Sequence, residues 1–102
     1  MRQVRYSTTF IHQFNALLAQ GEAKFGASVA DQKRELVYDT IDHYLARFPK
    51  KPRDPDIDLY THAISGTPFV VIYDFDDTEL RVFFIVHGHA DRVRIHPASV
   101  EW

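Results

Sequence analysis

The sequence lacks several features that define whole classes of protein. It contains no cysteine, so it can form neither a disulfide framework nor a thiolate zinc site. No apolar run approaches the roughly 18 residues that cross a membrane, and no signal-peptide pattern follows Met1. These absences predict a soluble protein of a reducing compartment, with the cytoplasm as the default location and no membrane partner.

An excess of charge of one sign is missing as well. The 12 lysine and arginine residues are nearly balanced by 14 aspartate and glutamate residues, so the formal net charge is −2. No overall field would draw this chain to nucleic acid. One local basic cluster is present all the same: Arg47, Lys50, Lys51 and Arg53. It can contact phosphates or, as is commoner for such a run, be the solvated end of a helix.

Apolar and aromatic residues, in contrast, are plentiful. Hydrophobic residues make up 45% of the 102 residues and aromatic residues 14%, which is ample for a packed interior and argues against disorder. A chain of this length has room for one core. We therefore expect a single domain over residues 1–102.

The first part of the chain predicts a strand and a helix. Residues 2–7 alternate Val4 and Tyr6 with polar neighbours, as a half-buried strand does. Residues 10–25 then place apolar side chains on one helical face, behind hydroxyl residues 7–9 that can cap the start, and Gly26 can cap the end. The residues of this face are Phe10, Phe14, Leu17, Leu18 and Phe25.

A second helix follows almost at once. Ser28 with Asp31 resembles a capping box, and Pro49 would stop the helix. Between them runs an apolar stripe in which only the lysine is polar: Val29, Lys33, Leu36, Val37, Ile41, Tyr44, Leu45 and Phe48. Because only about two residues link the helices, they should fold back on each other as an antiparallel hairpin.

The second half of the chain has the period of strands. Three short runs rich in β-branched and aromatic residues, 59–64, 69–75 and 80–86, are separated by turn sequences. The last run is apolar on both faces and should lie inside the sheet, with Leu80, Val82, Phe84 and Val86 on one face and Phe83 and Ile85 on the other. The order βααβββ predicts an α+β fold, with the helix hairpin on one face of a small, mainly antiparallel sheet.

One acidic motif could carry chemistry. Asp74-Phe-Asp-Asp-Thr78 matches the Asp-x-Asp-x-Thr nucleophile motif of haloacid-dehalogenase-like phosphatases, in which the first carboxylate attacks phosphorus. That chemistry needs magnesium, a distant lysine and further acidic ligands, and too few residues follow Thr78 to supply them. We therefore favour a polar hairpin turn whose carboxylates accept backbone N–H bonds.

A second constellation is rich in histidine. His87 and His89 lie two apart, and with Asp91 and His96 they could in principle bind a metal ion, but the spacing is weakly specific among six histidines. We favour a structural role in which His87 ends a buried strand and Gly88 supplies a turn. The sequence thus predicts no metal and no cofactor.

Arg81 lies inside an otherwise apolar strand. Its charge must reach the edge of the sheet or pair with a carboxylate. It is therefore either a structural ion pair or the basic element of a binding face.

The element order and several short motifs together resemble the RelE/ParE toxin superfamily of bacterial type II toxin–antitoxin systems. The motifs are the Ser65-Gly66 turn, the strand Pro68-Phe-Val-Val-Ile-Tyr73, the acidic turn after it, and the strand ending Ile85-Val-His-Gly-His-Ala-Asp-Arg92. The similarity covers nearly the whole chain. It implies a RelE/ParE-like toxin domain, a cognate antitoxin as its partner, and a role in plasmid stabilisation.

Two mechanisms occur in that superfamily. RelE-like members are ribosome-dependent mRNA endonucleases whose basic side chains neutralise the scissile phosphate, whereas ParE-like members poison DNA gyrase by protein contact. The strand 59–62 has none of the lysines of RelE-like enzymes, and Val70 and Ala90 occupy the places of two arginines. His96 replaces the C-terminal tyrosine, and of these positions only His96 could move a proton.

The missing cations favour the ParE-like alternative, and the slightly acidic net charge suits a protein target better than RNA. The resemblance thus implies a gyrase inhibitor that is neutralised by its antitoxin and is not itself an enzyme. It assigns partner or target binding to Arg81, His87, His89, Asp91, Arg92 and Arg94. Two alternatives stay open, an mRNA endonuclease with His96 as its catalytic candidate and an inactive relative of the fold.

Overall fold

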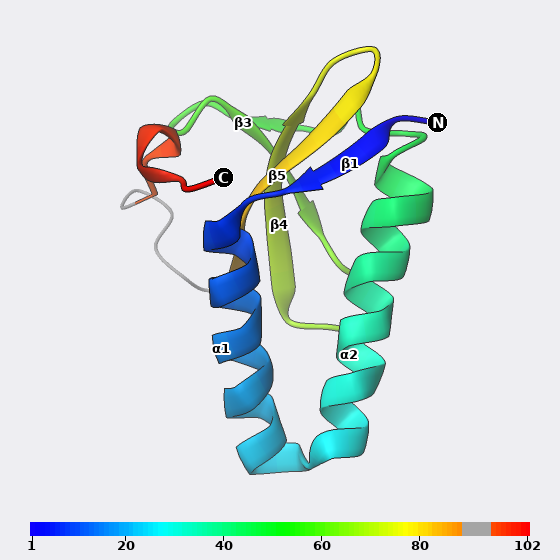
Figure 1. The fold of residues 1–102 in the computed structure, drawn as a ribbon, viewed down its shortest axis with the longest axis vertical. Coiled ribbons are helices and arrows are strands. Elements are labelled where there is room, and N and C mark those ends of the chain that lie inside the picture. The colour runs from blue at the N-terminus through cyan, green and yellow to red at the C-terminus, as the bar shows by residue number, and fades with distance from the viewer. Residues whose placement is uncertain (89–94) are drawn as a thin grey trace.

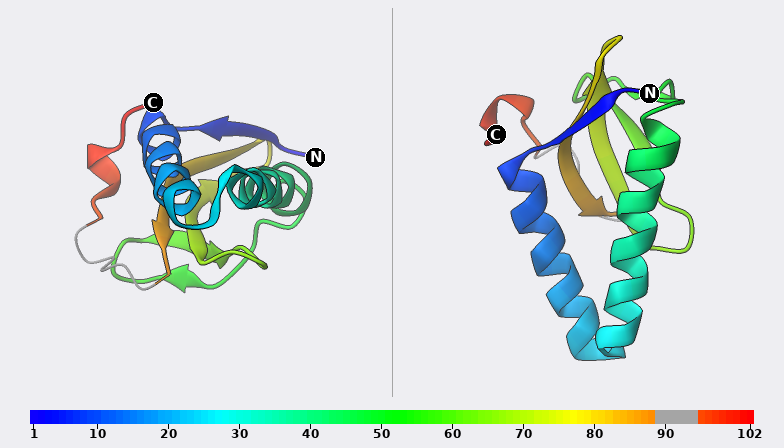
Figure 2. Two further views of the ribbon diagram at one scale, coloured as in Figure 1. Left: turned by 90° about the horizontal axis from the view of Figure 1, so that it is seen from below. Right: turned by 45° about the vertical axis from the view of Figure 1, so that its right-hand side comes forward.

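The computed structural model describes residues 1–88 and 95–102, and the chain folds into two layers (Figure 1). A five-stranded sheet forms one layer, and two long helices cover one of its faces (Figure 2). In chain order the elements are β1 (Gln3–Tyr6), α1 (Thr8–Phe25), α2 (Ala27–Asp39), the π turn η1 (Thr40–Leu45), β2 (Arg53–Asp54), β3 (Leu59–Ala63), β4 (Phe69–Phe75), β5 (Glu79–His87) and the 3₁₀ turn η3 (Pro97–Ser99).

The predicted α+β fold is confirmed, with one strand added. The strand order across the sheet is β1-β5-β4-β3-β2, in which β1 pairs with β5 in parallel and every other neighbouring pair is antiparallel. β5 lies inside the sheet, as its apolar character predicts. The added β2 has two residues and follows Pro52, which has no N–H to extend the ladder, so its sequence carries little strand signal.

Ser7 joins α1 to the middle of the sheet. As the N-cap of α1, its hydroxyl accepts the N–H of Phe10 (2.8 Å), and the same hydroxyl donates to the carbonyl of Phe83 in β5 (2.6 Å). The N–H of Ser7 donates to the carbonyl of Val82 (3.0 Å). Since Ser7 is fully buried, these bonds satisfy polar groups that water cannot reach.

The junction between the helices differs in part from the prediction. Gly26, with a φ of 91°, is the C-cap of α1, as expected, and also the N-cap of α2, so a single residue separates the helices. The predicted capping box is wrong, because Ser28 lies inside α2 and the carboxylate of Asp31 pairs with Arg34 (2.8 Å). The helix hairpin itself is confirmed by the packing of α1 against α2 (Figure 1).

The second helix ends in the π turn η1. There the N–H of Ala46 donates to the carbonyl of Ile41, five residues before it (3.1 Å). Ile41, Leu45 and Ala46 are all fully buried in and directly after this wider turn.

The predicted apolar stripes are wider than the faces that the helices bury. Leu36, Tyr44 and Phe48 are 41%, 41% and 61% exposed. A helix buries only the residues on one of its faces, so a stripe this wide cannot face the sheet as a whole. Leu36, Tyr44 and Phe48 lie at the margin of the stripe and remain exposed. Phe25, next to Gly26 at the end of α1, is 63% exposed.

A β-bulge in β5 changes which of its residues face the helices. The pairing between β4 and β5 shifts after residue 72, which leaves Phe83 as the extra residue. Leu80, Val82 and Ile85 pack in the core on the helix side, whereas Phe84 packs on the opposite, outer face. The predicted grouping of Phe84 with Leu80 and Val82 is wrong, because the bulge breaks the strict alternation of side chains.

The buried apolar side chains form two clusters, one on each face of the sheet. The larger lies between the helices and the sheet and includes Phe10, Phe14, Val37, Ile41, Val71, Tyr73 and Leu80. The smaller lies on the outer face and comprises Ile57, Leu59, Ile72 and Phe84, against which Ile95 and Val100 pack. The outer face is thus partly covered by the chain's own residues.

Replacing Ser7 by alanine should destabilise the fold by about 2 kcal/mol, because it removes the cap of α1 and the bond to Phe83 together. Equilibrium urea unfolding measures the difference. Ser28→Ala is the matched control, because this exposed serine caps no helix and its replacement should change the free energy of unfolding by less than about 0.5 kcal/mol. Equal effects of the two substitutions would contradict the role of Ser7.

Candidate functional site

The predicted binding residue Arg81 forms a structural ion-pair network. Its guanidinium contacts the carboxylates of Asp74 (2.6 Å), Asp76 (2.9 Å) and Glu79 (3.2 Å). The register of β4 and β5 places Asp74 directly opposite Arg81, so the antiparallel pair brings the opposite charges together. The sequence allowed Arg81 to be either a structural ion pair or the basic element of a binding face, and the structure shows the ion pair.

The acidic motif after β4 is a hairpin turn, as interpreted from the sequence. Asp76 Oδ1 accepts the N–H of Thr78 (2.9 Å) and the N–H of Glu79 (2.8 Å). The hydrogen bond from Arg81, followed by these backbone N–H bonds, holds the pKa of Asp76 well below its ordinary value. Because Asp74 and Asp76 both bind Arg81, neither carboxylate is positioned as a nucleophile.

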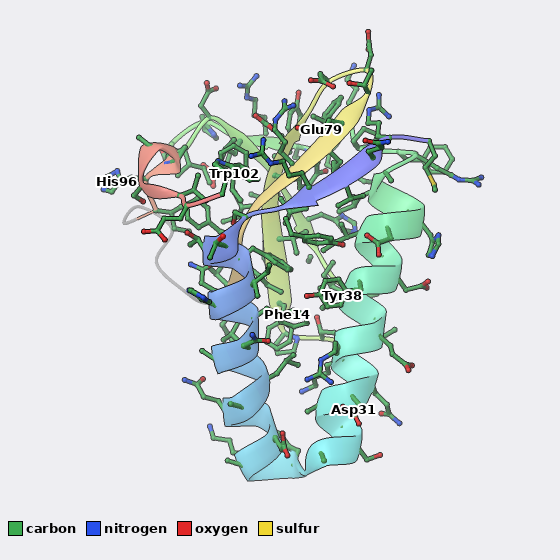
Figure 3. The ribbon with its side chains drawn as sticks, viewed as in Figure 1. Phe14, Asp31, Tyr38, Glu79, His96 and Trp102 are labelled. Atoms are coloured by element: carbon green, nitrogen blue, oxygen red, sulfur yellow. The ribbon has the colours of Figure 1, made fainter. Side chains whose placement is uncertain are left out.

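The histidine-rich constellation is described only in part. His87 ends β5 opposite Phe69, and His96 is an exposed residue just before η3, on the far side of the fold from Tyr38 (Figure 3). Among residues 1–88 and 95–102, no three metal-binding side chains come together. Four predicted binding residues lie outside the described residues, and their roles stay predictions: His89, Asp91, Arg92 and Arg94.

The strands at the centre of the sheet carry little positive charge. Val70 is buried within β4, and neither β3 nor β4 contains a lysine or arginine. Arg81, the one cation of β5, is bound to carboxylates. On the outer face, Leu59, Ile72 and Phe84 are themselves buried, and Ile95 and Val100 pack against them. β3, β4 and β5 therefore offer no lysine and no free arginine to neutralise the charge that develops on a phosphate during cleavage.

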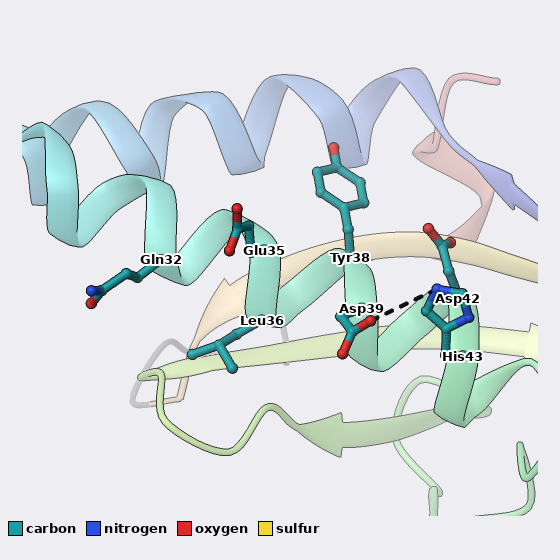
Figure 4. A pocket seen from close by; sticks show the side chains of 7 residues that line it. All are labelled: Gln32, Glu35, Leu36, Tyr38, Asp39, Asp42 and His43. Atoms are coloured by element: carbon teal, nitrogen blue, oxygen red, sulfur yellow. Dashed lines mark ion pairs between the residues drawn. The ribbon is translucent and has the colours of Figure 1, made fainter.

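A groove of about 720 Å³ lies along α2 and η1 (Figure 4). Three of its seven lining residues are acidic, and the lining comprises Gln32, Glu35, Leu36, Tyr38, Asp39, Asp42 and His43. Asp39 faces His43 (3.7 Å), and Asp42 accepts the hydroxyl of Tyr6 (2.5 Å). Burial, and then the bond to Asp42, raises the pKa of Tyr6 far above its ordinary value, so this tyrosine stays a neutral donor.

No serine, cysteine or lysine is among the residues that line the groove. Leu36 and Tyr38 supply apolar contact area, and the carboxylates supply hydrogen-bond acceptors. This arrangement suits the binding of a group that carries apolar surface and hydrogen-bond donors.

A second surface feature lies where η1 passes β3. The ring of Tyr44 lies 5.9 Å from that of Phe48 and 5.6 Å from that of His62. The ammonium group of Lys51 lies 4.4 Å from the centre of the Tyr44 ring and donates to its hydroxyl. Burial, and then the charge of Lys51, lowers the pKa of His62, so its ring is neutral at pH 7. We call these four residues the aromatic–lysine cluster.

The sequence did not reveal this cluster, because helical spacing places Tyr44 and Phe48 on the stripe that should be buried. The one signal in the sequence is that the apolar stripe of the second helix is wider than the face that a helix can bury. The predicted basic cluster, meanwhile, does not act as one unit: Lys51 contacts Tyr44, whereas Arg53 pairs with Asp58 (2.9 Å).

Comparison with known proteins gives a match in structure and none in sequence. No protein-family model and no curated protein match the chain. Its fold is similar to that of a solved chain from the "Chromosomal ParDE TA system from P. aeruginosa", with a TM-score of 0.67 and 13% sequence identity. The match covers 85% of this chain and 96% of that chain. At this identity the likeness shows the fold alone, and that fold agrees with the one that the resemblance in sequence implies.

Replacing Arg81 by methionine should raise the pKa of Asp76 toward its ordinary value, because the largest cause of the depression is lost while the N–H bonds in the turn stay. An NMR titration of side-chain carboxyls measures the pKa. A depressed carboxyl pKa stabilises the folded state above the unfolded pKa, and this stabilisation is lost as the pH falls. The variant should therefore lose less stability on acidification than the unmodified protein.

Arg53→Met is the control for that titration, since Arg53 pairs with Asp58 and not with Asp76. It should leave the pKa of Asp76 unchanged. If both variants leave it unchanged, Arg81 is not its main determinant.

Proposed function

We propose that this chain is the toxin of a type II toxin–antitoxin pair, that it acts on DNA gyrase by protein contact, and that a cognate antitoxin neutralises it. The observation that carries the proposal is the fold, which matches a chain of a ParDE system over 85% of this chain. The element order expected from the sequence and the motifs between Ser65 and Arg92 support the same assignment.

The distribution of charge supports gyrase over messenger RNA as the target. A ribonuclease of this fold needs cations on the sheet to stabilise a phosphate, and here β3 and β4 have none while Arg81 is bound to three carboxylates. A protein target requires shape and apolar contact instead.

The antitoxin is expected to pack an extended or helical segment along the helix hairpin and the edge of the sheet. Exposed apolar side chains are available there, namely Leu36, Tyr44 and Phe48. They are the kind of residue that a free monomer leaves exposed only at some cost in solubility, so a partner that covers them is favourable.

Target binding by the residues after β5 remains part of the proposal. Since Arg81 is engaged in the turn, the cations left for a partner in this region are Arg92 and Arg94, next to His87, His89 and Asp91 in sequence. Arginine is well suited to this task, because its guanidinium makes several directed hydrogen bonds across an interface.

Expression of the chain alone should arrest growth, and coexpression with the neighbouring reading frame should restore it. The purified chain should inhibit DNA supercoiling by gyrase and leave messenger RNA on translating ribosomes intact. Gyrase assays and primer extension on ribosome-bound mRNA measure the two activities. Cleavage at defined codons, abolished by His96→Ala, would instead establish the endonuclease. Neither activity, with no growth arrest, would identify an inactive relative of the fold.

Replacing Arg92 and Arg94 together by alanine should raise the concentration needed for half-maximal gyrase inhibition by about tenfold, because charge-assisted contacts to the target are lost. The control is Arg34→Ala, which removes an exposed helix arginine paired with Asp31 and should leave inhibition unchanged. Full inhibition by the double variant, with an unchanged thermal midpoint, would exclude both arginines from the interface.

A further inference from the structure

The exposed side of α2 and η1 carries its charged residues in a fixed order. Glu35 and Asp39 come first along the chain, and His43 and Arg47 follow. All four are exposed and recur at every fourth position, so they follow one side of the helix. Arg47 belongs to the basic cluster that the sequence predicts, and in the described part of the chain neither Arg47 nor Glu35 forms an ion pair.

The stability of the helix itself does not account for this order. Like charges four residues apart destabilise a helix, and Glu35 stands four residues before Asp39. The helix dipole favours acids in the first turn, and the first turn of α2 has none. Positive charge brought to Glu35 and Asp39 from outside the helix would relieve the repulsion between them.

The charged residues at the two ends of this pattern lie on one margin of the exposed side. Figure 4 shows Glu35 on the margin that faces α1. Arg47 lies next to Met1 and Arg2, which precede the strand that leads into α1. The negative and the positive end are therefore on the same margin, about three helical turns apart.

The opposite margin faces β3 and is apolar. Leu36 approaches Gly66 in the turn after β3, and Tyr44 of the aromatic–lysine cluster packs on His62 of β3. Leu36 and Tyr44 are both 41% exposed. They lie eight residues apart, about two helical turns, and leave an apolar strip beside the charged margin.

This side of the helix is complementary to itself when it is turned end over end. In a symmetric pair, residue i of one copy meets residue j of the other, and residue j of the first meets residue i of the second. Two antiparallel copies that cross at Thr40 place Leu36 opposite Tyr44 and Glu35 opposite Arg47. A two-fold axis perpendicular to the helices keeps each margin on its own side, so the charged margins meet each other and so do the apolar ones.

We propose that two copies of this chain associate through α2 and η1 as an antiparallel, symmetric pair. Glu35 of each copy pairs with Arg47 of the other, and Leu36 of each copy packs on Tyr44 of the other. The two-fold axis makes each contact twice, which doubles the effect of every substitution in the interface.

The order of the charges selects a second copy as the occupant of this side. A partner segment of one charge sign would match one half of the side and meet like charge on the other half. A second copy brings its basic end to the acidic end of the first, and its acidic end to the basic end. It supplies an apolar margin of matching length as well.

The pair goes beyond the proposed function and does not depend on it. Leu36 and Tyr44 also belong to the surface that is proposed for the antitoxin. The symmetric pair is therefore the form expected of the chain without its antitoxin, and an antitoxin would have to displace the second copy.

Reversal of single charges tests the pair by sedimentation equilibrium of the full chain. The unmodified chain should reach twice the mass of one chain as its concentration rises. Glu35→Arg sets arginine against Arg47 of the other copy, and Arg47→Glu sets two carboxylates against each other. Each variant alone should raise the dissociation constant by about tenfold or more. An equimolar mixture of the two variants should return it to within about threefold of the original value, because each copy then carries the charge that the other requires.

The matched controls make the same changes of charge on α1. Glu22→Arg and Lys24→Glu replace exposed residues near the turn between the helices, at the opposite end of the hairpin from η1. They should leave the dissociation constant unchanged, both alone and mixed. Circular dichroism verifies that every variant folds.

The absence of cysteine from the chain permits a second test. Thr40 is half-buried and lies at the crossing point, next to Thr40 of the other copy. Thr40→Cys should therefore form a disulfide-linked dimer under mild oxidation, which electrophoresis without reductant detects. Ala16→Cys, at an exposed position of α1, is the matched control and should remain a single chain.

A mass of one chain at every concentration up to about 100 μM would overturn the proposal. A dimer that neither single charge variant weakens, or equal cross-linking of Thr40→Cys and Ala16→Cys, would overturn it as well. These tests require neither toxicity nor an antitoxin. A chain that arrests growth as a monomer would keep the proposed function and lose the pair, whereas a chain without toxic activity that forms the pair would lose only the function.

Discussion

The hydrogen bonds of Ser7 at the bulge of β5 are the interaction on which the arrangement of the two layers depends. β1 pairs with β5 as far as Tyr6 and Val82, and the chain then leaves the sheet and begins α1 at once. Ser7 bonds both layers at that point, through the carbonyl of Phe83 and the N–H of Phe10. One turn later in α1, Gln13 accepts the N–H of Ile85 (3.0 Å). The helix thus supplies hydrogen bonds to Phe83 and Ile85 that a neighbouring strand would otherwise supply.

This junction also explains which aspects of the fold the sequence could predict. Periodicity identifies elements that bury one face, and it locates α1, β3, β4 and β5 within a residue or two of their bounds. It does not locate the end of the second helix, because the apolar pattern continues to Phe48 whereas α2 ends at Asp39 and the π turn η1 at Leu45. It carries no information on a bulge, because an extra residue such as Phe83 has the same apolar character as its neighbours. The orientation of Phe84 is decided by a backbone contact between distant parts of the chain, and local sequence does not encode it.

The site was harder to predict than the fold for a related reason. Spacing assigned Tyr44 and Phe48 to the core, yet the π turn and the width of the stripe leave both at the surface. Arg81 was recognised as an ion pair or a binding residue, and only the register of β4 and β5 decides between these roles by placing Asp74 opposite it. In both cases the sequence supplied the chemical group, and tertiary structure determined whether a partner could reach it.

The pairing of β1 with β5 has a further consequence for the life of the chain. Gln3 aligns with Glu79, and the N–H of Thr9 reaches the carbonyl of Glu101 (3.3 Å), so the start of the chain closes on its end. Contacts between such distant residues form late, because a long loop must close first. During synthesis the first strand and the N-cap of α1 must wait until β5 has left the ribosome. Until then the helix hairpin can form by local contacts, but it has no completed sheet on which to pack. Assembly of the two layers is thereby coupled to the synthesis of β5, and a product that ends before β5 would lack the completed sheet.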